Sequence, residues 1–387
     1  MRILVTSTPG TGHIHPLIPL ALALRDRGHE IIWATGPSSC RTVEAFGIPT
    51  RPAGPDVGPR NQRFASLTHH LAQLPPRDRR IVAMPLMFGT LSAPVMRDAL
   101  VPLFDELRPD LVLHEVAELA AAPLASIRGI PHVTVAFSDV VTPAVTAAVA
   151  DSLAAIWLAA GLAPASDSGW FDHLYLHPFP PSMTAPSEVA HPTLLACRPR
   201  SVSTVGRAEP ALERLAGLGV DRPLIYVTFG TEMGARAPWH PLLAALAEID
   251  AEVLVTLGNP AVAEQLGPVP PNVAVEAWVP QDAVLGRAAL VVSHAGAGTV
   301  LAAAAAGVPQ LCLPIAADQW DNADALVRAG AGRVLEMDGR SREAIAVAIG
   351  EMLAGGWEPA ARSVAAEIEA MPDLDEIVPR VEALVAG

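Results

Sequence analysis

The chain has 387 residues, of which 51% are hydrophobic and 17% are charged. This length suits two or three globular domains, and the composition is too apolar for a disordered chain. A net charge of −14 repels polyanions and argues against nucleic acid as a partner. All 26 basic residues are arginine, which excludes a P-loop lysine, a Schiff base and a pyridoxal phosphate aldimine.

The apolar stretches predict neither a signal peptide nor a membrane span. The first ends at Thr6, and a later one, 144–150, is far shorter than the roughly 20 residues of a spanning helix. The three cysteines, Cys40, Cys197 and Cys312, lack the spacing of a disulfide framework or a metal site. We therefore expect a soluble, cytoplasmic protein with reduced thiols and no integral membrane association.

Short apolar runs recur along the chain, each followed by a turn and a longer helical pattern. Because these runs do not alternate with polar residues, they indicate strands buried on both faces, as in parallel sheets covered by helices. The predicted fold class is α/β, doubly wound. The predicted strands are 3–6, 30–34, 110–114, 131–136, 224–229, 252–257, 272–277, 289–293 and 310–313.

The sequence divides into two halves of similar design, each of which opens with a strand and a glycine-containing turn. We expect a Rossmann-like domain over 1–200, a linker over 201–221 and a second Rossmann-like domain over 222–370. The final stretch, 371–387, is a candidate to pack back on the first domain. Ligands of such sheets bind beyond the carboxyl ends of the strands, so a shared site is expected in a cleft between facing domains.

The loop after the first strand carries a histidine with two interpretations. A dinucleotide site is disfavoured because His15 stands where the third glycine of that fingerprint would fall. His13, at the strand-to-helix turn, is either a catalytic base or a side chain used for local capping. Glu115, after strand 110–114, either accepts the other ring N–H of His13 or complements a helix dipole.

The strongest signal is a series of three segments in the second half. The middle one has small residues that let backbone amides approach a diphosphate at a helix N-terminus. Any one segment is also consistent with a structural turn, a core aromatic residue or a solvated acid, but their order makes coincidence improbable. The segments are Trp278-Val279-Pro280-Gln281, Ser293-His294-Ala295-Gly296-Ala297-Gly298-Thr299 and Leu313-Pro314-Ile315-Ala316-Ala317-Asp318-Gln319.

Together with Gly12-His13, these segments resemble the family 1 glycosyltransferases of the GT-B fold, most closely the bacterial natural-product enzymes that use nucleotide-activated deoxysugars. The resemblance spans nearly the whole chain. It implies that His13 is the general base and that Glu115, where many relatives carry aspartate, orients it. It also implies a set of donor-binding residues: Gly12, Thr231, Trp278, Val279, Gln281, His294, Gly296, Gly298, Thr299, Asp318 and Gln319.

One departure from the family pattern concerns the nucleotide. Relatives that use UDP-sugars usually carry a ribose-binding glutamate where this chain has Ala302. A carboxylate facing a missing 2′-hydroxyl would be buried and only half satisfied, so its absence favours a TDP-sugar. The alternative is drift at a helix position that suits alanine.

Soft and aromatic residues of the first half suggest an apolar aglycone as acceptor. Core packing is the alternative explanation for many of them. No residues stand at metal-ligand spacing, so we expect no metal and no other cofactor, with the TDP-sugar as co-substrate. The candidate acceptor-binding residues are Met84, Met87, Phe88, Trp170 and Phe171.

The expected function is therefore inverting transfer of a sugar, such as a deoxysugar, from a TDP-sugar to a hydroxyl of an apolar natural product. One alternative is a nucleotide-sugar epimerase on the same fold, which would isomerise the donor without an acceptor. Another is a catalytically silent nucleotide-sugar-binding auxiliary protein, against which the presence of His13 argues. The sequence does not identify the sugar or the aglycone, and it does not decide whether the chain forms a homodimer.

Overall fold

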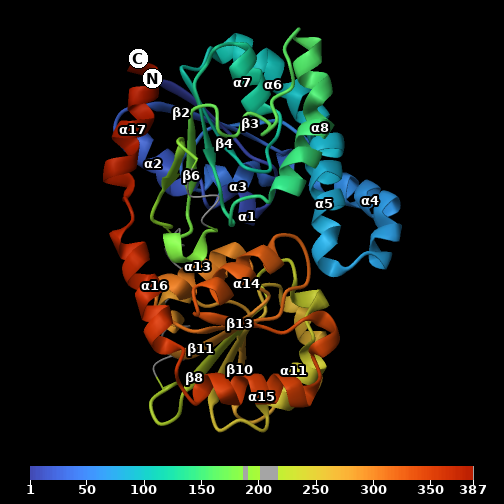
Figure 1. Cartoon of the computed structure of the whole chain (residues 1–387), viewed down its shortest axis with the longest axis vertical. Coiled ribbons are helices and arrows are strands. Elements are labelled where there is room, and N and C mark those ends of the chain that lie inside the picture. The colour runs from blue at the N-terminus through green and yellow to red at the C-terminus, as the bar shows by residue number, and fades with distance from the viewer. Residues whose placement is uncertain (186–190, 201–216, 387) are drawn as a thin grey trace. The chain divides into compact units, whose positions relative to one another are not determined.

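The computed structural model describes residues 1–185, 191–200 and 217–386, which fall into two compact units. Unit 1 contains 1–178, 186–202 and 371–387, and unit 2 contains 179–185 and 203–370. Each unit has a parallel sheet with flanking helices, which confirms the α/β doubly wound class (Figure 1). Most of the expected linker, 201–216 of 201–221, lies outside the described residues.

The sheet of unit 1 has seven strands in the order β3-β2-β1-β4-β5-β6-β7, all parallel. The first strand pairs with β2 on one side and β4 on the other, with Thr6 level with His114. The loops that follow β1 and β4 therefore adjoin at the carboxyl edge of the sheet. The strands are β1 (Arg2–Thr6), β2 (Glu30–Thr35), β3 (Thr50–Pro52), β4 (Leu111–Glu115), β5 (His132–Val135), β6 (Leu174–His177) and β7 (Leu194–Ala196).

Apolar residues on both faces of this sheet are buried against helices, because parallel strands covered on both sides need no polar face. The helices of unit 1 are α1 (Thr11–Ile14), α2 (Ile18–Asp26), η1 (Pro37–Ser39), α3 (Cys40–Glu44), α4 (Val57–Thr68), η2 (His69–Gln73), η3 (Pro76–Asp78), α5 (Arg79–Met84), the π-helix η4 (Pro85–Ser92), α6 (Ala93–Leu107), α7 (Ala121–Ile127), α8 (Pro143–Ala159) and α17 (Leu374–Ala386).

The last helix, α17, lies beside α2 although more than 340 residues separate them in sequence (Figure 1). Ile377 and Val381 are fully buried in the same cluster as Leu24 of α2. Arg27 donates two hydrogen bonds to Glu382, at 3.2 and 2.8 Å. The carboxyl-terminal helix is thus part of the core of unit 1.

The sheet of unit 2 has six parallel strands in the order β10-β9-β8-β11-β12-β13. Its strands are β8 (Leu224–Thr228), β9 (Glu252–Thr256), β10 (Val273–Glu276), β11 (Ala288–Ser293), β12 (Gln310–Cys312) and β13 (Gly332–Val334). Its helices are η5 (Pro181–Met183), η6 (Gly234–Arg236), α11 (Trp239–Leu246), η7 (Pro260–Gln265), α12 (Gln281–Leu285), α13 (Ala297–Ala305), α14 (Gln319–Arg328), η8 (Met337–Gly339), α15 (Arg342–Leu353) and α16 (Glu358–Ala370).

All nine predicted strands are present, and the described residues contain four further short strands that were not predicted, β3, β6, β7 and β13. The segment Phe179–Ala185 groups with unit 2, whereas the sequence analysis assigns it to the first domain. Among the helices that the structure describes, none combines the length and the apolar character needed to cross a membrane.

Candidate active site

His13 and Glu115 meet at the carboxyl edge of the first sheet. The chain leaves β1 and enters the short helix α1 through Gly10, whose φ of 131° is a conformation that a side chain would strain. His13 follows on α1, and Glu115 is the last residue of β4. The Nδ1 atom of His13 lies 3.3 Å from Oε1 of Glu115, and their side chains are 22% and 0% exposed.

Glu115 is held as a buried, ionised carboxylate. The backbone N–H and the hydroxyl of Thr8 donate hydrogen bonds to Oε1, at 3.0 and 2.7 Å, and the N–H of Ala117 donates to Oε2 at 2.5 Å. Burial by itself raises the pKa of Glu115, but the charge of His13 and the hydrogen bonds from Thr8 outweigh it, so the pKa is lowered. A negative charge therefore faces one ring nitrogen of His13.

Two aromatic rings pack edge-on against the His13 ring. The ring centroid of Phe88, on η4, lies 5.6 Å away, and that of Phe137 lies 5.0 Å away. Phe88 and its neighbour Met87, both expected to contact the acceptor, are partly buried. Sequence reasoning missed Phe137, although its position directly after the predicted strand 131–136 is the signal that could have found it. The imidazole thus has a carboxylate on one side and apolar surface around it.

The other acceptor candidates lie in different surroundings. Trp170 and Met84 are 1% and 6% exposed and belong to the hydrophobic core of unit 1. Core packing, the alternative explanation for such residues, accounts for both side chains, and their contact with an acceptor stays a prediction. Phe171 is partly buried and stacks on Tyr175, with ring centroids 4.5 Å apart and planes at 17°.

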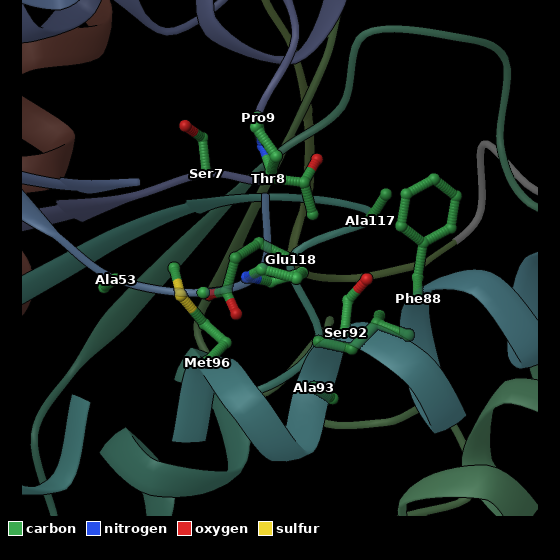
Figure 2. Close-up of a pocket in the computed structure, with 13 residues that line it drawn as sticks. Ser7, Thr8, Pro9, Ala53, Phe88, Ser92, Ala93, Met96, Ala117 and Glu118 are labelled. Atoms are coloured by element: carbon green, nitrogen blue, oxygen red, sulfur yellow. The ribbon is translucent and has the colours of Figure 1, made fainter. Parts of the chain in front are cut away.

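A second carboxyl group, Glu118, lies behind the loop that follows β1. Glu118 lines a small cavity of about 10 Å³. In Figure 2 the Glu118 side chain lies between residues 7–9 on one side and Ser92 and Met96 on the other. Thr6 donates a hydrogen bond to it at 2.7 Å. Burial raises the pKa of Glu118 to about 7, against the hydrogen bond from Thr6 and with help from the charge of Glu115.

The glycine-rich loop of unit 2 wraps closely around His294. The loop joins β11 to α13, with Gly296 as the residue before the helix and Gly298 exposed in its first turn. A Cβ atom on Gly296 would lie 2.4 Å from Nε2 of His294, so this position has room only for glycine. Ala295, between them, has a φ of 61°, a left-handed conformation that is uncommon outside glycine.

His294 differs from His13 in its environment. It is 8% exposed, and its Nδ1 is buried without a hydrogen-bond partner among the described residues. Burial lowers the pKa of His294 to about 4, although the charge of Asp318 opposes this. The ring is therefore neutral at pH 7 and available as a hydrogen-bonding group at the N-terminus of α13.

The structure joins the Trp-Val-Pro-Gln segment to the glycine-rich loop. Gln281, the first residue of α12, donates a hydrogen bond from Nε2 to Oγ1 of Thr299, at 3.4 Å. Trp278 is partly buried in the loop after β10, whereas Val279 is 4% exposed and packs in the core. Tyr226 of β8, to which sequence reasoning gave no role, is buried in the same hydrophobic cluster as Val279 and forms a hydrogen bond with Thr256 at 2.9 Å.

The Asp-Gln pair begins helix α14. Oε1 of Gln319 accepts hydrogen bonds from the N–H groups of Ile315 and Ala316, at 2.7 and 2.9 Å, and so holds the preceding loop. Asp318 accepts a hydrogen bond from Asn322 at 3.0 Å. The remaining donor candidates are exposed: Gly12 lies on α1, which follows the first strand of unit 1, and Thr231 lies in the turn after β8, the first strand of unit 2.

No group of three or more His, Cys, Asp or Glu side chains within 1–185, 191–200 and 217–386 is arranged to hold a metal ion. The polar groups of unit 2 that follow the strands of its sheet are hydroxyls, amides, the neutral imidazole of His294 and the carboxylate of Asp318.

This arrangement agrees with the known relatives. The chain is 33% identical to the elloramycin glycosyltransferase ElmGT of Streptomyces olivaceus, over 98% of this chain and 97% of the relative. It belongs to the family 1 natural-product glycosyltransferases. Residues 240–384 match the family described as the C-terminal domain of erythromycin biosynthesis protein CIII-like proteins. The L-demethylnoviosyl transferase of Streptomyces niveus is 31% identical, over 87% of this chain and 86% of the relative.

Solved glycosyltransferase structures share the fold over the whole chain. VinC in complex with dTDP has a TM-score of 0.80 at 26% identity and covers 100% of both chains. SsfS6 of Streptomyces sp. SF2575, in complex with thymidine diphosphate, has a TM-score of 0.76 at 26% identity and covers 99% of both. Because these relatives are transferases, they favour glycosyl transfer over the epimerase and auxiliary alternatives.

Proposed function

We propose that this glycosyltransferase moves a sugar from a TDP-sugar to a hydroxyl of an apolar acceptor, with inversion at the anomeric carbon and without a metal ion. The observation that carries the proposal is the His13–Glu115 pair. A partly exposed imidazole stands 3.3 Å from a fully buried carboxylate, at the edge of the sheet where ligands of this fold class bind.

In the proposed reaction His13 acts as the general base. Nδ1 faces Glu115, which leaves Nε2 to accept the proton of the acceptor hydroxyl. The acceptor oxygen forms a bond to the anomeric carbon while the bond from that carbon to the diphosphate breaks. The proton ends on His13 and the electron pair leaves with TDP. Glu115 favours this step because its charge stabilises the imidazolium that forms.

The leaving diphosphate is assigned to the glycine-rich loop of unit 2. Free backbone N–H groups at the start of α13 and the neutral ring of His294 are hydrogen-bonding groups suited to a developing negative charge. Trp278 and Gln281 are assigned to the base and ribose, and Asp318 and Gln319 to the sugar. Turnover is expected to continue in EDTA, and a complete loss that Mg²⁺ restores would contradict this part of the proposal.

Ala302 and the relatives support TDP as the nucleotide. Ala302 is partly buried on α13 and packs beside the cluster that contains Tyr226 and Val284, so no carboxylate stands at this position to bind a ribose diol. A further relative, 29% identical, is named a TDP-daunosamine transferase. An apolar acceptor is supported by Phe88 and Phe137, which flank His13.

Calorimetry with TDP and UDP tests the donor assignment without knowledge of the sugar. TDP is expected to bind more tightly, and tenfold tighter binding of UDP would overturn the assignment. The inverting mechanism is tested separately, by comparing the anomeric configuration of donor and product by NMR. Retained configuration would contradict a single displacement with His13 as base.

A further inference from the structure

We infer that the acceptor carries an ionised oxygen, either a carboxylate or an acidic enol, which Arg60 binds beside the His13 base. This inference rests on the proposed function and adds the chemical class of the acceptor. Arg60 belongs to α4, a helix that carries none of the site residues predicted from the sequence.

Arg60 and His13 both contact Phe88. The guanidinium carbon of Arg60 lies 5.9 Å from the centroid of the Phe88 ring, and the His13 ring lies 5.6 Å from the same centroid. Helix α4 and the π-helix η4, which carries Phe88, are packed together within unit 1. The cation therefore belongs to the apolar surroundings of the proposed base and not to a separate face of the unit.

The hydrogen bonds of Arg60 leave part of its guanidinium unused. Nε and Nη2 donate to Oδ1 of the neighbouring Asn61, at 3.2 and 3.1 Å. Nη1 is buried and has no hydrogen-bond partner among the described residues. A guanidinium has five N–H donors, and leaving buried donors of a charged group unpaired is costly. An anionic oxygen from a ligand is the partner that such a group pairs with most strongly.

The charges around His13 explain how an anionic oxygen on the acceptor would assist the reaction. Burial lowers the pKa of Arg60, while the negative charge of Glu115 raises it. Glu115 already faces His13 and accepts hydrogen bonds from Thr8 and Ala117. When His13 takes a proton, it becomes a second cation near Arg60, which opposes the step. An anionic oxygen on the acceptor offsets the charge of Arg60 and so removes this penalty.

The test uses three small aromatic probes and does not depend on turnover. Two are anionic near neutral pH, 1-hydroxy-2-naphthoate through a carboxylate and 2-hydroxy-1,4-naphthoquinone through an acidic enol, and 1-naphthol is the neutral reference. Their affinities are measured by calorimetry for the wild-type chain, Arg60→Gln, Arg60→Lys and Arg63→Gln. Arg63 lies on the same helix but is exposed, so it provides the matched control.

The wild-type chain is expected to bind at least one anionic probe about tenfold more tightly than 1-naphthol, the size of one charge-assisted hydrogen bond. Arg60→Gln removes this preference, Arg60→Lys keeps part of it, and Arg63→Gln keeps all of it. The preference also weakens as salt is added. If 1-hydroxy-2-naphthoate shows the preference, the acceptor group is a carboxylate. If 2-hydroxy-1,4-naphthoquinone shows it, the acceptor group is an acidic enol.

Equal wild-type affinity for charged and neutral probes, absent binding of all three, or a preference that survives Arg60→Gln overturns the inference. TDP binding is measured on every variant. Because TDP is assigned to unit 2 and Arg60 lies in unit 1, retained 1-naphthol affinity and an unchanged circular dichroism spectrum show that Arg60→Gln is folded. If that variant fails to fold, the Arg60→Lys and salt measurements decide the matter. Failure of the wild-type chain to bind TDP would instead count against the proposed function, so the two failures are distinguishable.

Discussion

His13 in unit 1 and His294 in unit 2 both follow a buried parallel strand, yet their surroundings are opposite. His13 is partly exposed and stands 3.3 Å from the ionised Glu115. His294 is buried against Gly296, and burial lowers its pKa to about 4. A histidine beside a carboxylate is suited to receive a proton, whereas a histidine kept neutral is suited to give a hydrogen bond. The packing around each ring, and not the residue type, distinguishes the proposed base from the proposed diphosphate-binding group.

Replacing His13 gives the sharpest test of this comparison. His13→Ala is expected to lower kcat by about 10² to 10⁴, the usual contribution of a general base. Its TDP affinity stays nearly unchanged, because the nucleotide is assigned to unit 2. Steady-state kinetics and calorimetry measure the two quantities. Near-full kcat towards a weakly acidic alcohol would contradict the assignment.

Glu115→Gln is the matched variant for this measurement. It keeps a hydrogen-bond acceptor for the ring and removes the charge that favours the imidazolium, so we expect a smaller loss of kcat than in His13→Ala. An equal or greater loss, with an intact fold, would mean that Glu115 does more than orient and stabilise the base.

The second prediction concerns Glu118, whose raised pKa distinguishes it from the ionised Glu115 at the end of β4, three residues earlier. Because burial raises the pKa of Glu118 from 4.5 to about 7, its contribution to stability is present below pH 4.5 and is lost as the pH rises to about 7. Between pH 5 and pH 8, Glu118→Gln should therefore lose about 2 to 3 kcal/mol less unfolding free energy than the wild-type chain.

Chemical denaturation at the two pH values measures this difference. Glu264→Gln, at an exposed position of unit 2, is the control and should keep the wild-type pH dependence. If Glu118→Gln also keeps the wild-type pH dependence, Glu118 is ionised in the folded protein. The hydrogen bonds that it accepts from Thr6 and from the N–H groups of Ala120 and Ala121 then outweigh its burial.

The strands that carry the site were predictable because they are buried on both faces. Continuous apolar runs such as Ile3 to Val5 and Leu290 to Val292, each followed by a turn, are typical of strands covered on both faces. The four strands that were missed have three or four residues, and three of them, β3, β7 and β13, lie at the edges of their sheets. An edge strand such as Thr50–Pro52 pairs on one side only, so it needs no apolar run.

The site was predictable where its residues follow predicted strands and form motifs. His13, Glu115 and the glycine-rich loop meet that condition. Phe88 was found through its residue type, but its contact with His13 comes from the packing of η4. Arg60 gives no signal in the sequence, because a half-buried arginine and the exposed Arg63 of the same helix are indistinguishable without tertiary contacts.

The third prediction returns to the ring of His294. Gly296→Ala places a Cβ atom where Nε2 of His294 now lies, 2.4 Å away, so the ring or the loop must shift. We expect TDP affinity to fall at least tenfold, corresponding to about 1.4 kcal/mol. Calorimetry measures it. Gly350→Ala, on α15 with no atom near the added Cβ, is the control, and equal TDP affinity of both variants would mean that the loop tolerates the shift.

The smallest expected effect concerns Tyr226, a core residue of unit 2 whose hydroxyl interacts with Gln281 of the proposed nucleotide site. Its hydroxyl hydrogen-bonds Thr256 at 2.9 Å. Burial raises the pKa of Tyr226, while hydrogen bonds with Thr256, Thr228 and Gln281 oppose this. Gln281 in turn donates to Thr299 of the glycine-rich loop. The Tyr226 hydroxyl is thus placed to orient the carboxamide of Gln281.

Tyr226→Phe removes the hydroxyl and keeps the ring in the core. One neutral hydrogen bond contributes about 0.5 to 1.5 kcal/mol, so TDP affinity should fall roughly two- to tenfold. The TDP affinity of Gln281→Ala should fall at least as far. Adding Tyr226→Phe to Gln281→Ala should cause no further loss of TDP affinity, because the Tyr226 hydroxyl acts through the Gln281 carboxamide. Additive losses in this double-mutant cycle, or an unchanged TDP affinity in Tyr226→Phe with lowered stability, would make Tyr226 a core residue alone. The Tyr226 hydroxyl would then stabilise the fold of unit 2 and contribute nothing to nucleotide binding.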